Sequence, residues 1–362
     1  MADNTPLLPA SDRAKKIVKD NIAVDSLTAP IWGVLWTKEE QLHWFSDRHL
    51  ETGVDCLGFT ACTGPSTMAQ MLDTLRRYRK IMRERPEQYV IVRSARDVRY
   101  AHENGKQAIF FNSQSSEPVD YNLDNLALLR DLGIGTFMIV YNERFRAGDG
   151  CMIETINGTP AQPITPYGKK VIDACHHYGM IVDLSHSSEA TALSAIEYNR
   201  EKHSGKPLCC THEGVKHFHD FGRNASDEFI RGIGESGGVF SLCYINGFFG
   251  EPPADGGLHP PSDLVDHMDH VKRLIGVDHI GLSTDAGIDT SLIQGFMRAR
   301  PEAYDEWYRH VFLDSPCHYM DGELSQTLPA VIDEMLSRDY SEEDVIKIIG
   351  GNWMRIFEQV WG

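Results

Sequence analysis

Short apolar stretches alternate with amphipathic segments along most of this chain. Eight apolar stretches cover residues 22–27, 56–62, 108–112, 136–141, 180–186, 208–212, 239–244 and 279–285. Most are continuously apolar, which is typical of strands buried on both faces of a parallel sheet. Segments with helical spacing of apolar residues lie at 38–51, 66–85, 122–132, 165–178, 188–198, 227–236 and 262–275. This alternation favours an α/β fold, an amidohydrolase-like (β/α)8 TIM barrel.

An open, doubly wound sheet is the main alternative fold. Such a sheet usually carries a glycine-rich phosphate loop after its first strand, but here the first stretch runs into SLTAP at 26–30. We find no repeat, low-complexity tract or linker that would divide the chain. We therefore expect one barrel domain over residues 1–362, with an insertion around 286–328 and a Gly- and Pro-rich loop at 248–261. A capping box at 341–344 is expected to open a C-terminal helix.

Composition narrows the class of protein and its partners. The 362 residues include 35 basic and 52 acidic side chains, a formal net charge of −17. Such a charge repels nucleic acid and anionic membranes, so neither is expected as a partner. No stretch approaches the roughly 20 apolar residues of a membrane span, and the polar N-terminus lacks the apolar core of a signal peptide. The eight cysteines form no C-x-x-C pair, which fits a reduced, cytoplasmic protein. An insertion of this kind can form a contact between subunits, so a homo-oligomer stays open as an alternative.

Chemically capable residues stand at the ends of three predicted strands. His186 ends the fifth strand, His212 the sixth and Asp285 the eighth. The C-termini of barrel strands converge on one mouth, which holds the active site, and two imidazoles with a carboxylate can bind a divalent metal. A single strand-end histidine is more often a hydrogen-bonded core residue, but two on successive strands favour a site. Arg223 follows the sixth strand, and its fork suits a substrate carboxylate, although a surface arginine is equally compatible.

Several short motifs resemble those of the membrane (renal) dipeptidase family. They are VDLSHSS at 182–188, TH at 211–212, GRN at 222–224, IGLSTD at 280–285 and GGNWMRIF at 350–357. In the family their counterparts are Asp-Leu-Ser-His-x-Ser, Ser-His, Pro-Arg-Asn, Gly-x-Gly-Ser-Asp and Gly-Asn-x-x-Arg-Val-Phe. Their order and spacing match over roughly residues 165–357, which is more specific than any one motif alone.

The family's members are (β/α)8 barrels of the amidohydrolase type, and typical ones hold two zinc ions and hydrolyse dipeptides. The resemblance implies that His186 and His212 bind one metal. It implies that Asp285 binds metal and handles protons. Arg223 would then hold the carboxylate of the substrate.

The chain departs from the family's pattern on three strands. Where the first strand of the family supplies a His and an Asp to zinc, this chain has Leu27 and Ala29. The bridging Glu of the third strand is replaced by Ser113 or Gln114. Tyr141 stands where the family has a substrate-contacting His. We take Tyr141 and the adjacent Asn142 as candidate substrate contacts, and Tyr141 also as a catalytic hydrogen-bond donor.

These departures change the expected metal content. Two cations a few ångströms apart repel strongly without carboxylates between them. We therefore expect one divalent ion, zinc, rather than two, held by His186 and His212. Asp285, Tyr141, Gln114 or water would complete its coordination.

The sequence thus predicts a metal-dependent hydrolase. It would cleave an amide or peptide bond of a small, dipeptide-like substrate that carries a carboxylate. Two alternatives stay open, because fold does not fix function. One is the same barrel acting as a non-peptide C–N hydrolase or a lyase, and the other is a metal-free relative that only binds a ligand. Activity on ordinary dipeptides is expected to be weak.

Overall fold

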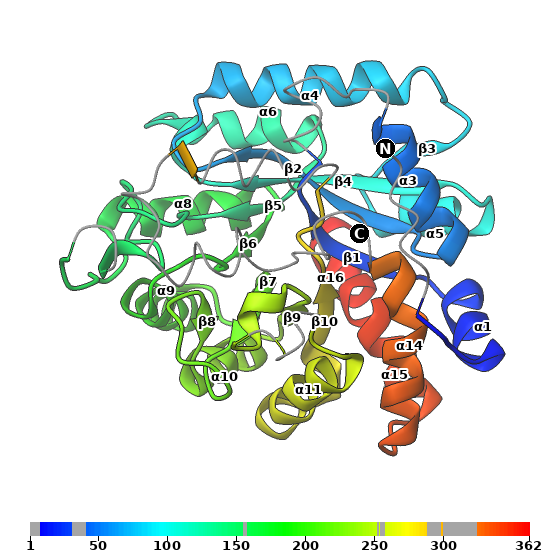
Figure 1. Cartoon of the computed structure of the whole chain (residues 1–362). Coiled ribbons are helices and arrows are strands. Elements are labelled where there is room, and N and C mark those ends of the chain that lie inside the picture. Colours follow the sequence, from blue (N-terminus) through cyan, green and yellow to red (C-terminus); the bar gives the residue numbers. More distant parts are fainter. Residues whose placement is uncertain are drawn as a thin grey trace.

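Parallel strands form the centre of the molecule, and helices surround them (Figure 1). The computed structural model describes residues 8–30, 41–154, 158–251, 253, 258–287, 298–299 and 324–362. Within them, eight strands follow one another in the order β1 (Val24–Thr28), β2 (Cys56–Thr63), β4 (Gln107–Gln114), β5 (Ile134–Met138), β6 (Ile181–Asp183), β7 (Leu208–Val215), β9 (Val239–Cys243) and β10 (Ile280–Ser283). Each neighbouring pair is parallel.

Hydrogen bonds bring the last strand beside the first, so that the barrel is nearly closed. The backbone N–H of Asp285 donates to the carbonyl of Leu27 over 3.0 Å, and that of Ala29 donates to the carbonyl of Ala286 over 2.7 Å. The hydroxyl of Ser283 also donates to the carbonyl of Leu27. The predicted (β/α)8 barrel is therefore confirmed.

Helices follow most of the strands and pack outside them. They are α1 (Asp12–Asp20), α3 (Gln41–Thr52), α4 (Met68–Met82), α5 (Ala95–Glu103), α6 (Asn125–Asp131), α8 (Pro166–His177), α9 (Glu189–Lys202), α10 (Asp227–Glu235), α11 (Pro261–Ile275), α14 (Leu324–Ser337), α15 (Glu342–Ile346) and α16 (Asn352–Trp361). Hydroxyl side chains accept backbone N–H bonds at several helix starts, including Ser188 before α9 and Ser226 before α10. The capping box expected at 341–344 is present at the start of α15.

The C-terminal helix α16 closes one end of the barrel. Its Trp353 and Phe357 are buried in a cluster with Val24, Cys56 and other residues from the first halves of the strands. The indole N–H of Trp353 donates to the hydroxyl of Ser241 in β9 over 2.9 Å. Figure 1 shows α16 in the middle of the ring, close to β1. The opposite end, where the strands finish, is left for the functional site.

The approach of the C-terminal segment to β1 depends on a glycine. A Cβ added to Gly350 would lie 2.1 Å from the carbonyl oxygen of Ile22. Real Cβ atoms do not approach that closely, so only glycine permits this contact. The segment Lys347–Gly351 is a turn of π-helix, a rare form that adds a residue to the turn.

All eight predicted strands are present, with boundaries shifted by a few residues. The sequence pattern did not predict the short strands β3 (Tyr89–Ile91) and β8 (Asn224–Ala225), or the helices α1 and α5. Most of the expected insertion at 286–328 and part of the loop at 248–261 lie outside the described residues. The single-domain organisation therefore stays a prediction. None of the helices in the described ranges combines the length and apolarity that a bilayer crossing requires.

Candidate active site

Two imidazoles meet at the end of the barrel where the strands finish. His186 lies three residues after β6, in the left-handed backbone region with a φ of +64°, and His212 lies in β7. Their Nε2 atoms are 3.0 Å apart, and both side chains are buried. A positive φ is uncommon outside glycine, and such strain often marks a functional position. The two strand-end histidines predicted to form a site are therefore adjacent.

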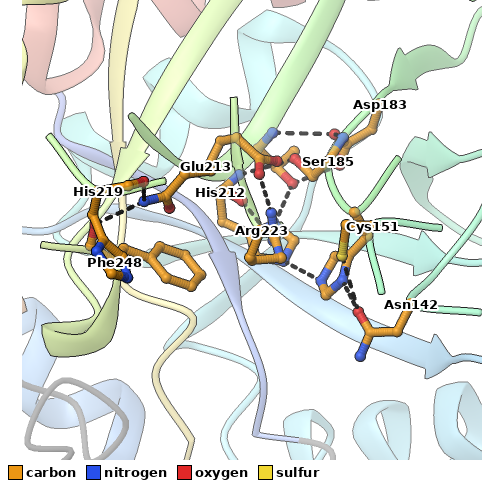
Figure 2. A network of polar contacts seen from close by, with 12 residues as sticks. Asn142, Cys151, Asp183, Ser185, His212, Glu213, His219, Arg223 and Phe248 are labelled. Carbon is orange, nitrogen blue, oxygen red and sulfur yellow. Dashed lines mark hydrogen bonds and ion pairs between the residues drawn. The ribbon is translucent and has the colours of Figure 1, made fainter. Parts of the chain in front are cut away.

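Hydrogen bonds on the far side of each ring fix where its proton lies. The Nδ1 atom of His186 is 2.6 Å from Oδ1 of Asn142, and an amide oxygen only accepts, so this nitrogen carries the hydrogen. The Nδ1 atom of His212 is 2.9 Å from the hydroxyl of Thr211, which itself donates to Asp183. The hydroxyl must then accept from Nδ1 of His212. Figure 2 shows Asn142, His212 and Asp183 in this network.

Both Nε2 atoms consequently direct a lone pair at the other. Burial, with the nearby charge of Arg223, holds the pKa of each imidazole well below its usual value, so neither ring readily takes a proton. Two lone pairs at this distance repel unless a cation lies between them. Two imidazole nitrogens on one zinc ion stand about 3.3 Å apart, close to the observed separation. The pair therefore fits a metal bound by both rings.

A complete set of metal ligands is not gathered around this pair. No group of three or more His, Cys, Asp or Glu side chains in the described ranges is arranged to hold a metal. Asp285, the expected third ligand, follows β10 and is likewise strained, with a φ of +54°. Burial raises the pKa of its carboxyl to about 7, and Arg223 opposes that rise. Its role as a ligand stays a prediction.

Asp25 supports Asp285 from the neighbouring strand β1. Its carboxylate accepts hydrogen bonds from the backbone N–H and the hydroxyl of Thr284, the residue before Asp285. Burial also raises the pKa of Asp25 to about 7. The sequence analysis did not single out Asp25, although it lies only two residues before Leu27.

Arg223 is buried in the site and already paired. Its Nη1 donates to the carboxylate of Glu213, and its Nη2 donates to the backbone carbonyl of His212 over 2.7 Å. The ring of Phe248 lies 5.3 Å from the guanidinium carbon. Figure 2 shows Arg223 beside Glu213 and His212. The sequence predicts that this fork binds a substrate carboxylate, and that role stays a prediction; in the structure the fork is paired with Glu213 of the protein itself.

Glu213 is the site residue that the sequence analysis missed. It lies in β7 directly after His212 and is only 3% exposed. Burial raises the pKa of its carboxyl to about 7, while the charge of Arg223 and the hydrogen bond from it oppose that rise. Its position next to a strand-end histidine was the available signal. From the sequence alone, a single glutamate directly after a strand is easily assigned to a solvated loop.

Tyr141 and Asn142 both reach the imidazole pair. The ring of Tyr141 stacks on that of His186, with centroids 4.2 Å apart. Asn142 fixes the His186 ring as described above. Both residues predicted to contact substrate therefore contact the first histidine, and their contact with a substrate stays a prediction.

The four residues at the positions where the sequence predicts missing metal ligands are all buried. Leu27 and Ala29 are buried at the end of β1. The hydroxyl of Ser113 donates to the carbonyl of Ser115 and lies 3.1 Å from Cys62 Sγ. The amide of Gln114 donates to the hydroxyl of Thr60 over 2.7 Å, in the chain of bonds between β4 and β2.

Comparison with known proteins agrees with this fold. The membrane dipeptidase family (peptidase family M19) matches residues 11–299. Dipeptidase ataJ of Aspergillus terreus is 23% identical over 313 residues, which cover 80% of this chain and 66% of that protein. An amidohydrolase structure from Pseudomonas aeruginosa superposes with a TM-score of 0.79 at 21% identity, covering 96% of this chain and 99% of the other.

A metallopeptidase structure from Rhodobacter sphaeroides was solved with a phosphinate mimic of the dipeptide L-Ala-D-Ala. It superposes with a TM-score of 0.74 at 18% identity, over 94% of this chain and 100% of that one. These structural likenesses establish an amidohydrolase-like barrel. Together with the family match over residues 11–299, they define its class: the chain belongs to the membrane dipeptidase family. It spans slightly less than two thirds of the ataJ dipeptidase.

Proposed function

We propose that this protein is a metal-dependent hydrolase that cleaves the amide bond of a small, dipeptide-like substrate. The observation that carries the proposal is the pair of Nε2 lone pairs of His186 and His212, 3.0 Å apart. Membership of a family of metallopeptidases implies a metal. The relative bound to a dipeptide mimic supports the substrate class.

The proposed metal content is one zinc ion per chain. His186 and His212 would hold it, and Asp285 would complete the protein's share of the ligands. A bound zinc ion supplies a Lewis acid that polarises a carbonyl and lowers the pKa of water. The apolar side chains of Leu27 and Ala29 offer nothing to a second ion. We therefore propose that this chain has lost the two metal ligands that the family carries on its first strand.

The remaining site residues act on protons and on the substrate. Asp285, whose carboxyl lies near the charge of Arg223, would also accept and return a proton during the reaction. Tyr141, stacked on His186, would donate a hydrogen bond to the oxygen on which negative charge develops. Asn142 holds the His186 ring by a hydrogen bond from Nδ1 and would also contact the substrate. Arg223 would meet a substrate carboxylate only if Glu213 left its fork.

Chelation and readdition of metal test this proposal on a panel of dipeptides and their amides. Hydrolysis should disappear with chelator and return with zinc. His186→Ala should lose both metal and activity, because a two-imidazole site cannot spare one ring. His176→Ala is a matched control, because that histidine is hydrogen-bonded to Asn199 away from the site, and it should keep both. Hydrolysis that survives complete removal of metal would refute the proposal.

A further inference from the structure

A small cavity is lined by Ser187 and Glu213, the residues that directly follow His186 and His212 in the chain. Its volume is about 100 Å³, and Cys151, Ser187, Glu213 and Asn224 are among the residues that line it. Among the described residues, Glu213 Oε2, Ser187 Oγ and Asn224 Oδ1 have no hydrogen-bond partner. Each of the three side chains is more than nine-tenths buried. Buried polar atoms are normally paired, so a cavity with three unpaired ones is suited to a ligand that donates hydrogen bonds.

The amide of Asn224 is held with its oxygen available. Its Nδ2 donates to the carbonyls of His219 and Phe248 over 3.0 and 2.9 Å, so both amide hydrogens are used. The oxygen lies against Gly214, where an added Cβ would be 1.8 Å away. Because Gly214 has no side chain, the amide oxygen of Asn224 can lie directly against its backbone. The acceptor is fixed by the fold and does not depend on side-chain rotation.

Glu213 connects this cavity to Arg223. One carboxylate oxygen pairs with the guanidinium, and the other is the unpaired acceptor. The second terminal nitrogen of Arg223 is used by the His212 carbonyl. A substrate carboxylate at this fork would place two anions on one buried cation. If the substrate carboxylate displaced Glu213 instead, it would leave that carboxylate without its partner, and an unpaired buried charge is strongly unfavourable.

We propose that Glu213 determines substrate specificity by occupying the Arg223 fork. The substrate end that lies here is then a neutral group with N–H donors, such as a primary carboxamide, and not a free carboxylate. Its hydrogens are accepted by Glu213, Ser187 and Asn224. This inference rests on the proposed function, since it names the substrate class of that same site.

A matched pair of substrates tests the inference: alanyl-alanine and alanyl-alaninamide, with products separated by chromatography. The wild-type zinc enzyme should cleave the amide with a kcat/KM about tenfold or more above that of the acid, the scale of one charge-assisted hydrogen bond. Glu213→Gln should reverse the preference by about the same factor, through a lower KM for the acid. Ser187→Ala should raise the KM of the amide alone.

The control is Glu117→Gln, which breaks another Arg–Glu pair, with Arg146, outside this cavity. It should leave the acid-to-amide ratio unchanged. A wild-type enzyme that prefers the acid would overturn the inference even if Glu213→Gln fails to fold, and so would an unchanged ratio in a folded Glu213→Gln variant.

If neither substrate is cleaved by the metal-loaded protein, the proposed function fails and binding becomes the readout. Calorimetric titration of the same two compounds then tests the inference separately. Tighter binding of the amide by about tenfold supports it, and equal or weaker binding of the amide contradicts it.

Discussion

Removing the hydroxyl of Thr211 should loosen the metal site more than it loosens the fold. Thr211 links Asp183 to His212: its hydroxyl donates to Asp183 Oδ2 over 2.5 Å and accepts from Nδ1 of His212 at 2.9 Å. Valine has nearly the same shape but cannot make either bond. In Thr211→Val the His212 ring loses the contact that sets its tautomer, and its Nε2 no longer has to present a lone pair.

The structure gives the scale of both effects. Asp183 keeps the backbone N–H groups of Ser185 and Thr211, so the variant leaves one carboxylate oxygen and one ring nitrogen short of a partner. A buried group without its partner costs about 1–3 kcal/mol, so the two groups together should lower the free energy of unfolding by about 2–6 kcal/mol. Loss of a group that orients a metal ligand typically lowers metal affinity by about 10–100-fold.

Two assays separate these effects. Denaturant unfolding of the metal-free protein measures stability, and competition with a zinc-binding dye measures affinity. The control is Thr191→Val, because the buried hydroxyl of Thr191 bonds Gln162 and Asp149 and no imidazole. Both variants should lose stability, but only Thr211→Val should lose zinc affinity. Equal zinc affinity in the two variants would refute the account of the His212 tautomer.

Three further predictions concern the site, the cavity and the fold. Tyr141→Phe should lower kcat while leaving zinc content unchanged, since it removes a donor but keeps the ring stacked on His186; unchanged kcat would exclude the proposed role. Gly214→Ala should cost about 1–3 kcal/mol in unfolding free energy, because its Cβ would meet Asn224 Oδ1 at 1.8 Å; wild-type stability would show that the amide moves freely. Burial lowers the pKa of His49 to about 4, from its ordinary value of 6.5, so the unfolded chain takes up this proton first and stability is lost as pH falls from about 6.5 to 4. His49→Gln should remove up to about 3 kcal/mol of that loss, and parallel stability curves for variant and wild type would contradict it.

The barrel was predictable because its strands leave a local pattern. Continuous apolar runs such as 180–186 and 208–212 are long enough to be seen in isolation, and the residues at their ends indicated His186 and His212. β8 consists of Asn224 and Ala225 alone, which is too short for any periodicity. Its pairing with β7 depends on packing between segments.

The side-chain contacts that position the two histidines could not be predicted from the sequence in the same way. Asn142 and Thr211 act on the two rings through side-chain contacts that join different strands and loops, and sequence spacing does not encode them. Glu213 was missed for a related reason. Its role depends on an ion pair with Arg223, which lies ten residues later and contacts Glu213 only in the folded protein. The arginine was identified by its chemistry, but its partner required the three-dimensional structure.

The central claim is that His186 and His212 together would bind one metal ion. The most direct test is elemental analysis of the protein purified without chelator, together with the variant His212→Ala. We predict close to one zinc ion per chain in the wild-type protein and almost none in the variant. Two tightly bound ions per chain, or a full complement of metal retained after loss of His212, would contradict the account.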